Sequence, residues 1–182
     1  MAEREHHYRI TTTWTGNLGS GTSDYRAYSR NHEIKILGKR APLPGSADQA
    51  FRGDPARYTP EELLVASLST CHMLWYLHLC ADSGITVIEY EDAAQGIMAE
   101  HPDGSGEFTR VVLRPRVVIT DPASIPAALA LTHRAHEVCI IARSLNFPVH
   151  HEHALVAPSP SLSYRTPPSP TPPPTPTSPT PR

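Results

Sequence analysis

Residues 59–77 read Thr-Pro-Glu-Glu-Leu-Leu-Val-Ala-Ser-Leu-Ser-Thr-Cys-His-Met-Leu-Trp-Tyr-Leu, and this stretch predicts the helix around which the chain is organised. Thr59 can cap the first free amides, the proline after it suits the first helical position, and Glu62 completes a capping box. No Gly or Pro follows before Gly84, which predicts about 24 helical residues and a length of roughly 36 Å. Apolar residues fall on nearly every face, so we expect the helix to be buried on most sides. Cys71 lies in its middle.

The 182-residue chain is mildly acidic, with a formal net charge of −2 and a pI near 6.6. It shows no basic stripe, so nucleic acid is not an expected partner. The first residues are charged and lack the apolar segment of a signal peptide. No apolar run reaches membrane-spanning length without a His, Asp or Glu, so no membrane is expected. Three cysteines without a secretion signal predict a reducing, cytoplasmic location.

The C-terminal segment differs in composition from the rest. Residues 157–182 hold more than half of the chain's 20 prolines, together with many Ser and Thr residues and almost no large apolar ones. Such a segment cannot bury enough surface to order itself. The sequence therefore predicts one domain over residues 1–156 and a Pro/Ser/Thr-rich disordered tail over residues 157–182.

Strand patterns occur in pairs rather than alternating singly with helices, which predicts an α+β fold with an antiparallel sheet. A long loop is expected over residues 38–58. A second helix is expected over residues 123–146, broken near residues 132–135. The expected strands cover residues 7–15, 24–30, 33–37, 85–99, 108–120 and 147–156.

Three cysteines are the first candidates for chemistry. Cys71 and Cys80 are nine residues apart on one helix, so they lie on opposite faces, about 13 Å apart along the axis, and cannot bridge each other. Cys139 belongs to an apolar, helical pattern that should pack near the central helix, so it can meet Cys71. Composition alone favours ordinary packing for a cysteine in an apolar helix.

Metal binding receives little support from ligand spacing. Cys71, His72, His136 and Cys139 could be drawn as a ligand set, but adjacent residues diverge by about 100° around a helix and no C-x₂-C motif occurs. A second group, His150, His151 and His153, is interpreted as a solvated strand end. No metal site is predicted.

A reactive Cys71 would need a positive charge that its own helix cannot provide. The dipole at the start of the helix fades within the first turn, and Cys71 lies three turns in. An arginine must therefore come from elsewhere in the chain or from another chain. The candidates are Arg26, Arg30, Arg52 and Arg57.

Two motifs carry a family resemblance. Thr-Pro-Glu-Glu-Leu-Leu-Val-Ala-Ser-Leu-Ser-Thr-Cys-His-Met (59–73) is followed later by Ala-His-Glu-Val-Cys-Ile-Ile-Ala-Arg-Ser-Leu-Asn-Phe-Pro-Val (135–149). In this order, each with its cysteine, they resemble the OsmC/Ohr family of osmotically inducible and organic-hydroperoxide-resistance proteins. The resemblance covers about residues 7–156, which makes residues 1–156 an OsmC-like domain. It implies antiparallel sheets wrapped around a long central helix, and an intertwined homodimer with sites at the interface.

The resemblance also implies a thiol-dependent peroxidase without a cofactor. In the family's pattern Cys71 is the peroxidatic cysteine, Cys139 the resolving cysteine, and Glu61 the glutamate that holds an arginine. Arg26 is the best match for that arginine, and Arg52 is the alternative. Organic hydroperoxides would be reduced better than hydrogen peroxide, through a Cys71 sulfenate and a Cys71–Cys139 disulfide that a small dithiol or dithiol protein reduces.

The alternative is a non-catalytic OsmC-like protein that binds a small ligand or has a stress-related role. Helix geometry adds one expectation to either hypothesis. Glu61 and Cys71 are ten residues apart, or about 15 Å along a straight helix, so they cannot contact one peroxide within a single helix. Either an arginine spans that gap, or Glu61 approaches Cys71 from the helix of a partner chain.

Overall fold

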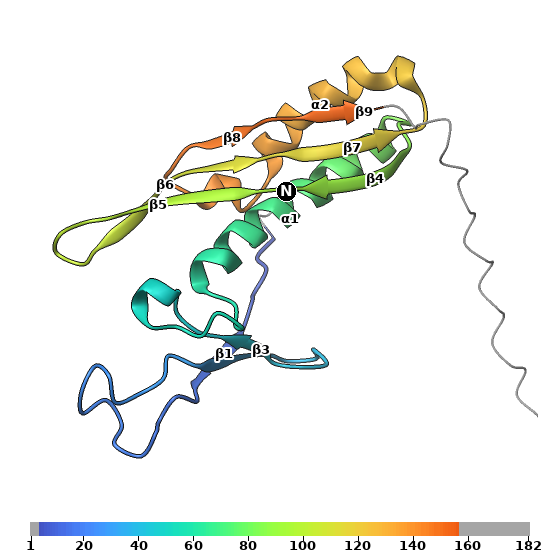
Figure 1. Ribbon diagram of the computed structural model, residues 1–182. Coiled ribbons are helices and arrows are strands. Elements are labelled where there is room, and N and C mark those ends of the chain that lie inside the picture. Colours follow the sequence, from blue (N-terminus) through green and yellow to red (C-terminus); the bar gives the residue numbers. More distant parts are fainter. Residues whose placement is uncertain (1–3, 157–182) are drawn as a thin grey trace, which may run out of the picture.

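The central helix forms as predicted in the computed structural model, which describes residues 4–156 (Figure 1). Helix α1 spans Pro60–Asp82. The Thr59 hydroxyl accepts the Glu62 amide at 3.2 Å, and the Glu62 carboxylate accepts the Thr59 amide at 2.9 Å, which confirms the capping box. Gly84 follows the helix with φ of 70°, a left-handed conformation that glycine adopts without strain.

The burial of α1 differs from the prediction. Its buried residues Leu68, His72, Tyr76 and Cys80 recur every four positions and form one stripe, while Leu74 is 63% exposed. The expectation of burial on most sides is wrong for a single chain, because the sheets and the second helix fully cover only that stripe and leave its neighbours partly exposed. By length and composition alone α1 could also cross a membrane, but core helices pass the same test, and α1 packs its buried stripe against the core of the fold.

The N-terminal region forms a three-stranded antiparallel meander at the start of α1, apart from the other sheets (Figure 1). Its strands are β1 (Ile10–Trp14), β2 (His32–Ile36) and β3 (Leu43–Gly45). The third strand comes from the predicted loop 38–58, which also contains a 3₁₀ turn at Gln49–Phe51.

The predicted strand over residues 24–30 is wrong, because local contacts fold this segment into turns. The Asp24 carboxylate accepts the Arg26 amide at 2.8 Å, a side-chain turn typical of aspartate. The Arg30 guanidinium lies over the rings of Tyr25 and Tyr28 and donates hydrogen bonds to their carbonyls.

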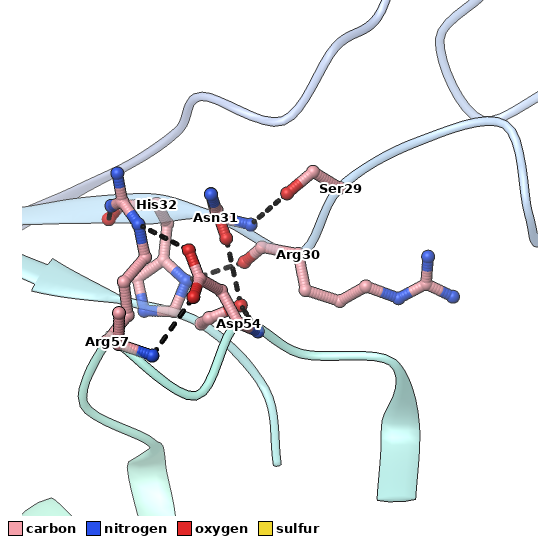
Figure 2. Close-up of polar contacts among 8 residues, drawn as sticks. Ser29, Arg30, Asn31, His32, Asp54 and Arg57 are labelled. Carbon is pink, nitrogen blue, oxygen red and sulfur yellow. Dashed lines mark hydrogen bonds and ion pairs between the residues drawn. The ribbon is translucent and has the colours of Figure 1, made fainter. Parts of the chain in front are cut away.

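The loop before α1 is fastened to the meander by a polar network. Buried Ser46 donates to the Asn31 side chain and accepts the Asp54 amide, each at 3.0 Å. Arg57 pairs with Asp54 at 3.5 Å and donates to the carbonyl of His32 (Figure 2). These contacts fix the start of α1 relative to the meander.

The region after α1 is one long hairpin divided between two sheets. Strands β4 (Val87–Asp92) and β5 (Gln95–Glu100) replace the predicted strand 85–99. Strands β6 (Gly106–Leu113) and β7 (Pro115–Ile119) replace the predicted strand 108–120. β5 pairs with β6 and β4 with β7, all antiparallel.

The two arms of the hairpin, β4–β5 and β6–β7, are interrupted at positions that lie opposite each other. The carboxylate of Asp92 accepts the amide of Arg114 at 2.7 Å, and Pro115 has no amide to continue the ladder. The chain therefore changes sheet between β4 and β5 and again between β6 and β7.

The second helix, α2, spans Ile125–Val138 after a short 3₁₀ turn at Pro122–Ser124. The predicted break near residues 132–135 is wrong, because Ala128, Thr132 and Ala135 are buried at helical spacing along an unbroken face. The helix ends instead before Cys139, whose backbone is extended, so this cysteine caps α2 rather than lying within it. A 3₁₀ turn follows at Ala142–Ser144.

The last predicted strand, 147–156, is two short strands. β8 (Val149–His151) pairs with β6, and β9 (Ala154–Val156) pairs with β7. Both pairings are parallel, so the sheets are not antiparallel throughout. The α+β fold around a long helix is confirmed. The predicted tail, 157–182, lies outside the described residues.

The apolar core has two parts along α1. One part contains Tyr76 and Cys80 and packs against β7 and α2. The other contains Leu68, Val111, Leu113 and Cys139. Cys71 packs against this second part.

Candidate active site

The structure brings Cys71 and Cys139 together. Cys71 is partly exposed on α1, whereas Cys139 is fully buried at the end of α2, and both are free thiols. Cys71 packs against the part of the core that contains Cys139, close enough to act on the ionisation of the Cys139 thiol. The Ala142 amide donates to the Cys139 sulfur at 3.4 Å and fixes the position of that thiol. A partly exposed thiol packed beside a buried one is the arrangement expected of two cysteines that form a disulfide after oxidation.

The buried thiol of Cys139 resists ionisation. Burial, followed by the contact with Cys71, raises the pKa of Cys139 to about 11. At neutral pH Cys139 is therefore a protonated thiol. Cys139 can act as a nucleophile only after it loses this proton. Cys71 is the thiol that is accessible to solvent.

Glu61 lies on a different side of α1, in a cleft of about 620 Å³. One of its carboxylate oxygens is buried and has no hydrogen-bond partner among residues 4–156. Asp48, Glu62 and Asp92 also line the cleft, and no Lys or Arg from residues 4–156 does. A buried, unpaired carboxylate oxygen among other carboxylates is an environment that a cation would stabilise.

Cys71 does not line this cleft. A hollow of about 230 Å³ further along the helix is lined by Leu74, Trp75 and His78, which follow Cys71 at helical spacing. The single chain thus keeps Glu61 and Cys71 apart, as their separation along the helix predicts.

None of the four candidate arginines lines the Glu61 cleft. Arg26 and Arg52 are exposed, and Arg52 adopts a left-handed backbone conformation with φ of 65°. Arg57 is held by Asp54, and Figure 2 shows the side chain of Arg30 pointing away from that pair. Among residues 4–156 no ion pair joins an arginine to Glu61.

The third cysteine has a separate environment. Cys80 is buried in the other part of the core and contacts the Tyr76 hydroxyl, and burial raises its pKa. Its place in the fold is consistent with packing and does not bring it near Cys71.

The sequence analysis missed the far wall of the Glu61 cleft. A side chain at Gly96 would place its Cβ within 2.6 Å of both Phe108 and Val65, so only glycine fits there. An isolated glycine within a strand pattern is a signal for such a close approach.

The fold and the cysteine pair define a member of the OsmC class of α+β proteins. The family model described as OsmC-like protein matches residues 53–154, more than half of the chain, so this protein belongs to that family.

Three relatives illustrate the similarity. An OsmC-like protein of unknown function from Vibrio cholerae is 33% identical, with a TM-score of 0.73 over 82% of this chain and 99% of that one. The organic hydroperoxide resistance protein OhrB of Bacillus subtilis is 17% identical, with a TM-score of 0.55 over 83% and 98%. The uncharacterized protein YmaD of Bacillus subtilis is 22% identical over 144 residues, covering 78% of this chain and 87% of that protein. The identities to OhrB and YmaD are low, so these two comparisons support only the fold.

Proposed function

We propose that this protein is a thiol-dependent peroxidase that reduces organic hydroperoxides, and hydrogen peroxide less well. The observation that carries the proposal is the packing of partly exposed Cys71 beside buried Cys139. The family relation supports it, because the relatives include a structure named as an organic hydroperoxide resistance protein.

The proposed cycle uses both cysteines. The Cys71 thiolate attacks one peroxide oxygen, the O–O bond breaks, and the alkoxide leaves as an alcohol after taking a proton. Cys71 is now a sulfenic acid. Cys139 attacks its sulfur, a disulfide forms, and water leaves. A small dithiol or dithiol protein then reduces the disulfide by exchange and regains both thiols, so the cycle requires no bound cofactor.

We propose that a second copy of the chain completes the site. The Cys71 thiolate needs a cation, and the acidic cleft around Glu61 needs one as well. The meander that carries Arg26 is exposed on both faces of β1, and its apolar side chains lack cover in one chain. Large exposed apolar groups on an edge strand are typical of an interface. In an intertwined homodimer this meander would cover the partner and bring Arg26, or Arg52, between Glu61 and Cys71.

The apolar surroundings of Cys71 support an organic substrate. Trp75 and Phe147 pack with Cys71 against the core part that contains Cys139, and Leu74 stands exposed beside the hollow. An alkyl group placed there would be removed from water at a gain of about 0.8 kcal/mol per buried CH₂. A reducing cytoplasm would supply the dithiol.

A non-catalytic, ligand-binding or stress-related member is the second candidate. The observation that favours it is the absence, within residues 4–156, of an ion pair between an arginine and Glu61. Steady-state reduction of cumene hydroperoxide with a dithiol distinguishes the two. A peroxidase consumes the peroxide catalytically and prefers it to hydrogen peroxide. Consumption no faster than that by the dithiol alone would reject the peroxidase and leave the binding protein.

A further inference from the structure

Four histidines from three parts of the chain meet beside the stripe of α1 that faces α2. This histidine cluster consists of His72 on α1, His136 on α2, His151 on β8 and His153 just after it. The ring centres of His72 and His136 each lie 4.8 Å from that of His151. The ring of His153 lies 5.6 Å from His151 and 6.2 Å from His72.

Each ring of the cluster carries a buried nitrogen without a hydrogen-bond partner among the described residues. These atoms are Nδ1 of His136 and Nε2 of His72, His151 and His153. Burying a polar atom without a partner costs free energy, and four such atoms in one place are unusual. The cluster is therefore suited to a ligand that accepts several nitrogen lone pairs at once.

His72 is arranged as a metal ligand commonly is. It is 1% exposed, its Nδ1 lies 3.4 Å from the Tyr90 hydroxyl, and its Nε2 is left free. Metal-binding histidines usually use one ring nitrogen for a second hydrogen bond that orients the ring, and offer the other to the metal.

We propose that the histidine cluster binds one Zn²⁺ or a similar divalent cation that prefers nitrogen ligands. Tetrahedral zinc with Zn–N distances of about 2.0 Å places the centres of its imidazole rings about 5 Å apart. Four of the six ring pairs lie 4.8–6.2 Å apart, among them all three pairs of His72, His151 and His153, so these three rings come near this spacing and His136 reaches them beside His151.

The rings must turn to converge on the ion. Within residues 4–156 no group of three donors is arranged to hold a metal as it stands. His151 and His153 are stacked, with an angle of 9° between their planes. The histidine χ2 torsion is broad, so a rotation of the rings about nearly fixed centres costs little.

The charge state of the cluster suits a cation. Burial lowers the pKa of His72 to about 4 and that of His151 to about 3, so both rings are neutral at pH 7. Neutral imidazole is the form that binds metal. Asp92 supplies a negative charge that acts on His72 and His153, although its oxygens already accept hydrogen bonds from Ser69 and Arg114.

The bound ion would clip α1, α2 and the C-terminal strands together. His72 lies on the face of α1 that contains Tyr76, a different face from that of Cys71, although the His136 carbonyl accepts the Cys139 amide at 3.3 Å. The proposal does not depend on peroxidase activity.

The test is titration of the reduced, metal-free full chain with Co²⁺ and Zn²⁺. All variants carry His6→Gln and His7→Gln, which remove an exposed histidine pair near the N-terminus. We expect one Co²⁺ per chain with the intense visible absorption of a tetrahedral site, displaced by Zn²⁺, and a melting temperature that rises with Zn²⁺. His151→Gln should weaken Zn²⁺ binding by about 100-fold.

The matched control is His150→Gln, next in sequence to His151 but exposed on the other face of β8. It should bind Zn²⁺ like the parent chain. If His151→Gln does not fold, His153→Gln, at a less buried position, replaces it with the same expected direction. Failure of the parent chain to bind Co²⁺ or Zn²⁺, an octahedral Co²⁺ spectrum, or equal loss of affinity in His150→Gln would overturn the proposal.

Discussion

At the scale of single residues, Cys71 and Cys139 have the same side chain but different surroundings. Cys71 is open to solvent on one side, whereas Cys139 is buried and held by the Ala142 amide. In the proposed cycle Cys71 reacts with the peroxide, and Cys139 then reacts with the Cys71 sulfenic acid. This difference makes separate predictions for the two thiols.

Removing each thiol should stop the proposed cycle at a different step. Cys71→Ser should lower peroxide consumption by about 10³-fold or more, because no nucleophile remains. Cys139→Ser should consume one peroxide per chain and then accumulate a Cys71 sulfenic acid, which dimedone traps for mass measurement. Cys80→Ala is the control and should stay within about twofold of the parent. Catalysis that survives in Cys71→Ser would contradict these roles.

Disulfide closure should accelerate with pH. Since burial and the contact with Cys71 raise the pKa of Cys139 to about 11, its thiolate fraction grows with pH across the neutral and alkaline range. After oxidation by one equivalent of peroxide, closure should become about tenfold faster per pH unit between pH 7 and 9. Stopped-flow fluorescence of Trp75, which packs with Cys71, can follow it. A closure rate independent of pH over this range would show that Cys139 deprotonation does not limit the step.

At the scale of elements, the sequence predicted those helix boundaries that are set by contacts between residues close together in the chain. Helix α1 begins and ends where its capping box and Gly84 indicate, because those contacts lie within a few residues. The division of the hairpin depends on Asp92 reaching the Arg114 amide, 22 residues away, and no local pattern reports that contact. The proximity of Cys139 to Cys71 could be inferred from two apolar motifs, but the extended backbone of Cys139 could not.

The histidine cluster illustrates the same limit. His72, His136 and His151 come from three elements, so their spacing in the sequence carries no metal-binding pattern. The acidic cleft around Glu61 is similar, since its walls come from the loop before α1, from α1 itself and from the hairpin. Such sites depend on tertiary packing that only the fold reveals.

The cap of α1 should contribute measurably to stability. Thr59→Ala removes the hydroxyl that accepts the Glu62 amide and should lower the free energy of unfolding by about 1 kcal/mol. Thr70→Ala, on the exposed side of the same helix, should change it by less than about 0.5 kcal/mol. Urea denaturation followed by circular dichroism compares the two. Equal effects would mean that the capping box adds nothing beyond helix propensity.

At the scale of the whole molecule, the single chain has an exposed apolar surface and an acidic cleft without a compensating cation among the described residues. The meander exposes Ile10, Trp14 and Leu37, and the cleft around Glu61 lacks a cation among its lining residues. A second chain would cover the apolar side chains of the meander, and its own meander would bring an arginine to the cleft. This proposal makes activity a property of the dimer.

Mixed dimers separate a shared site from a site within one chain. Cys71→Ser and Arg26→Ala should each be inactive alone. If Arg26 acts on the Cys71 of the partner, a mixed dimer of the two variants contains one intact site and should recover about half the parent activity per dimer. Repeating the mixture with Arg52→Ala identifies which arginine acts. No recovery with either arginine variant, in a mixture shown to exchange chains, would place the site within one chain.

The pairing of Cys71 with Cys139 is the central claim, and one measurement tests it most directly. The reduced protein is treated with one equivalent of cumene hydroperoxide, unreacted thiols are blocked, and the disulfides are mapped by peptide mass spectrometry. We predict a Cys71–Cys139 disulfide within the chain and an unmodified Cys80. A chain that keeps all three thiols reduced, or a disulfide that includes Cys80 in place of Cys139, would contradict the account.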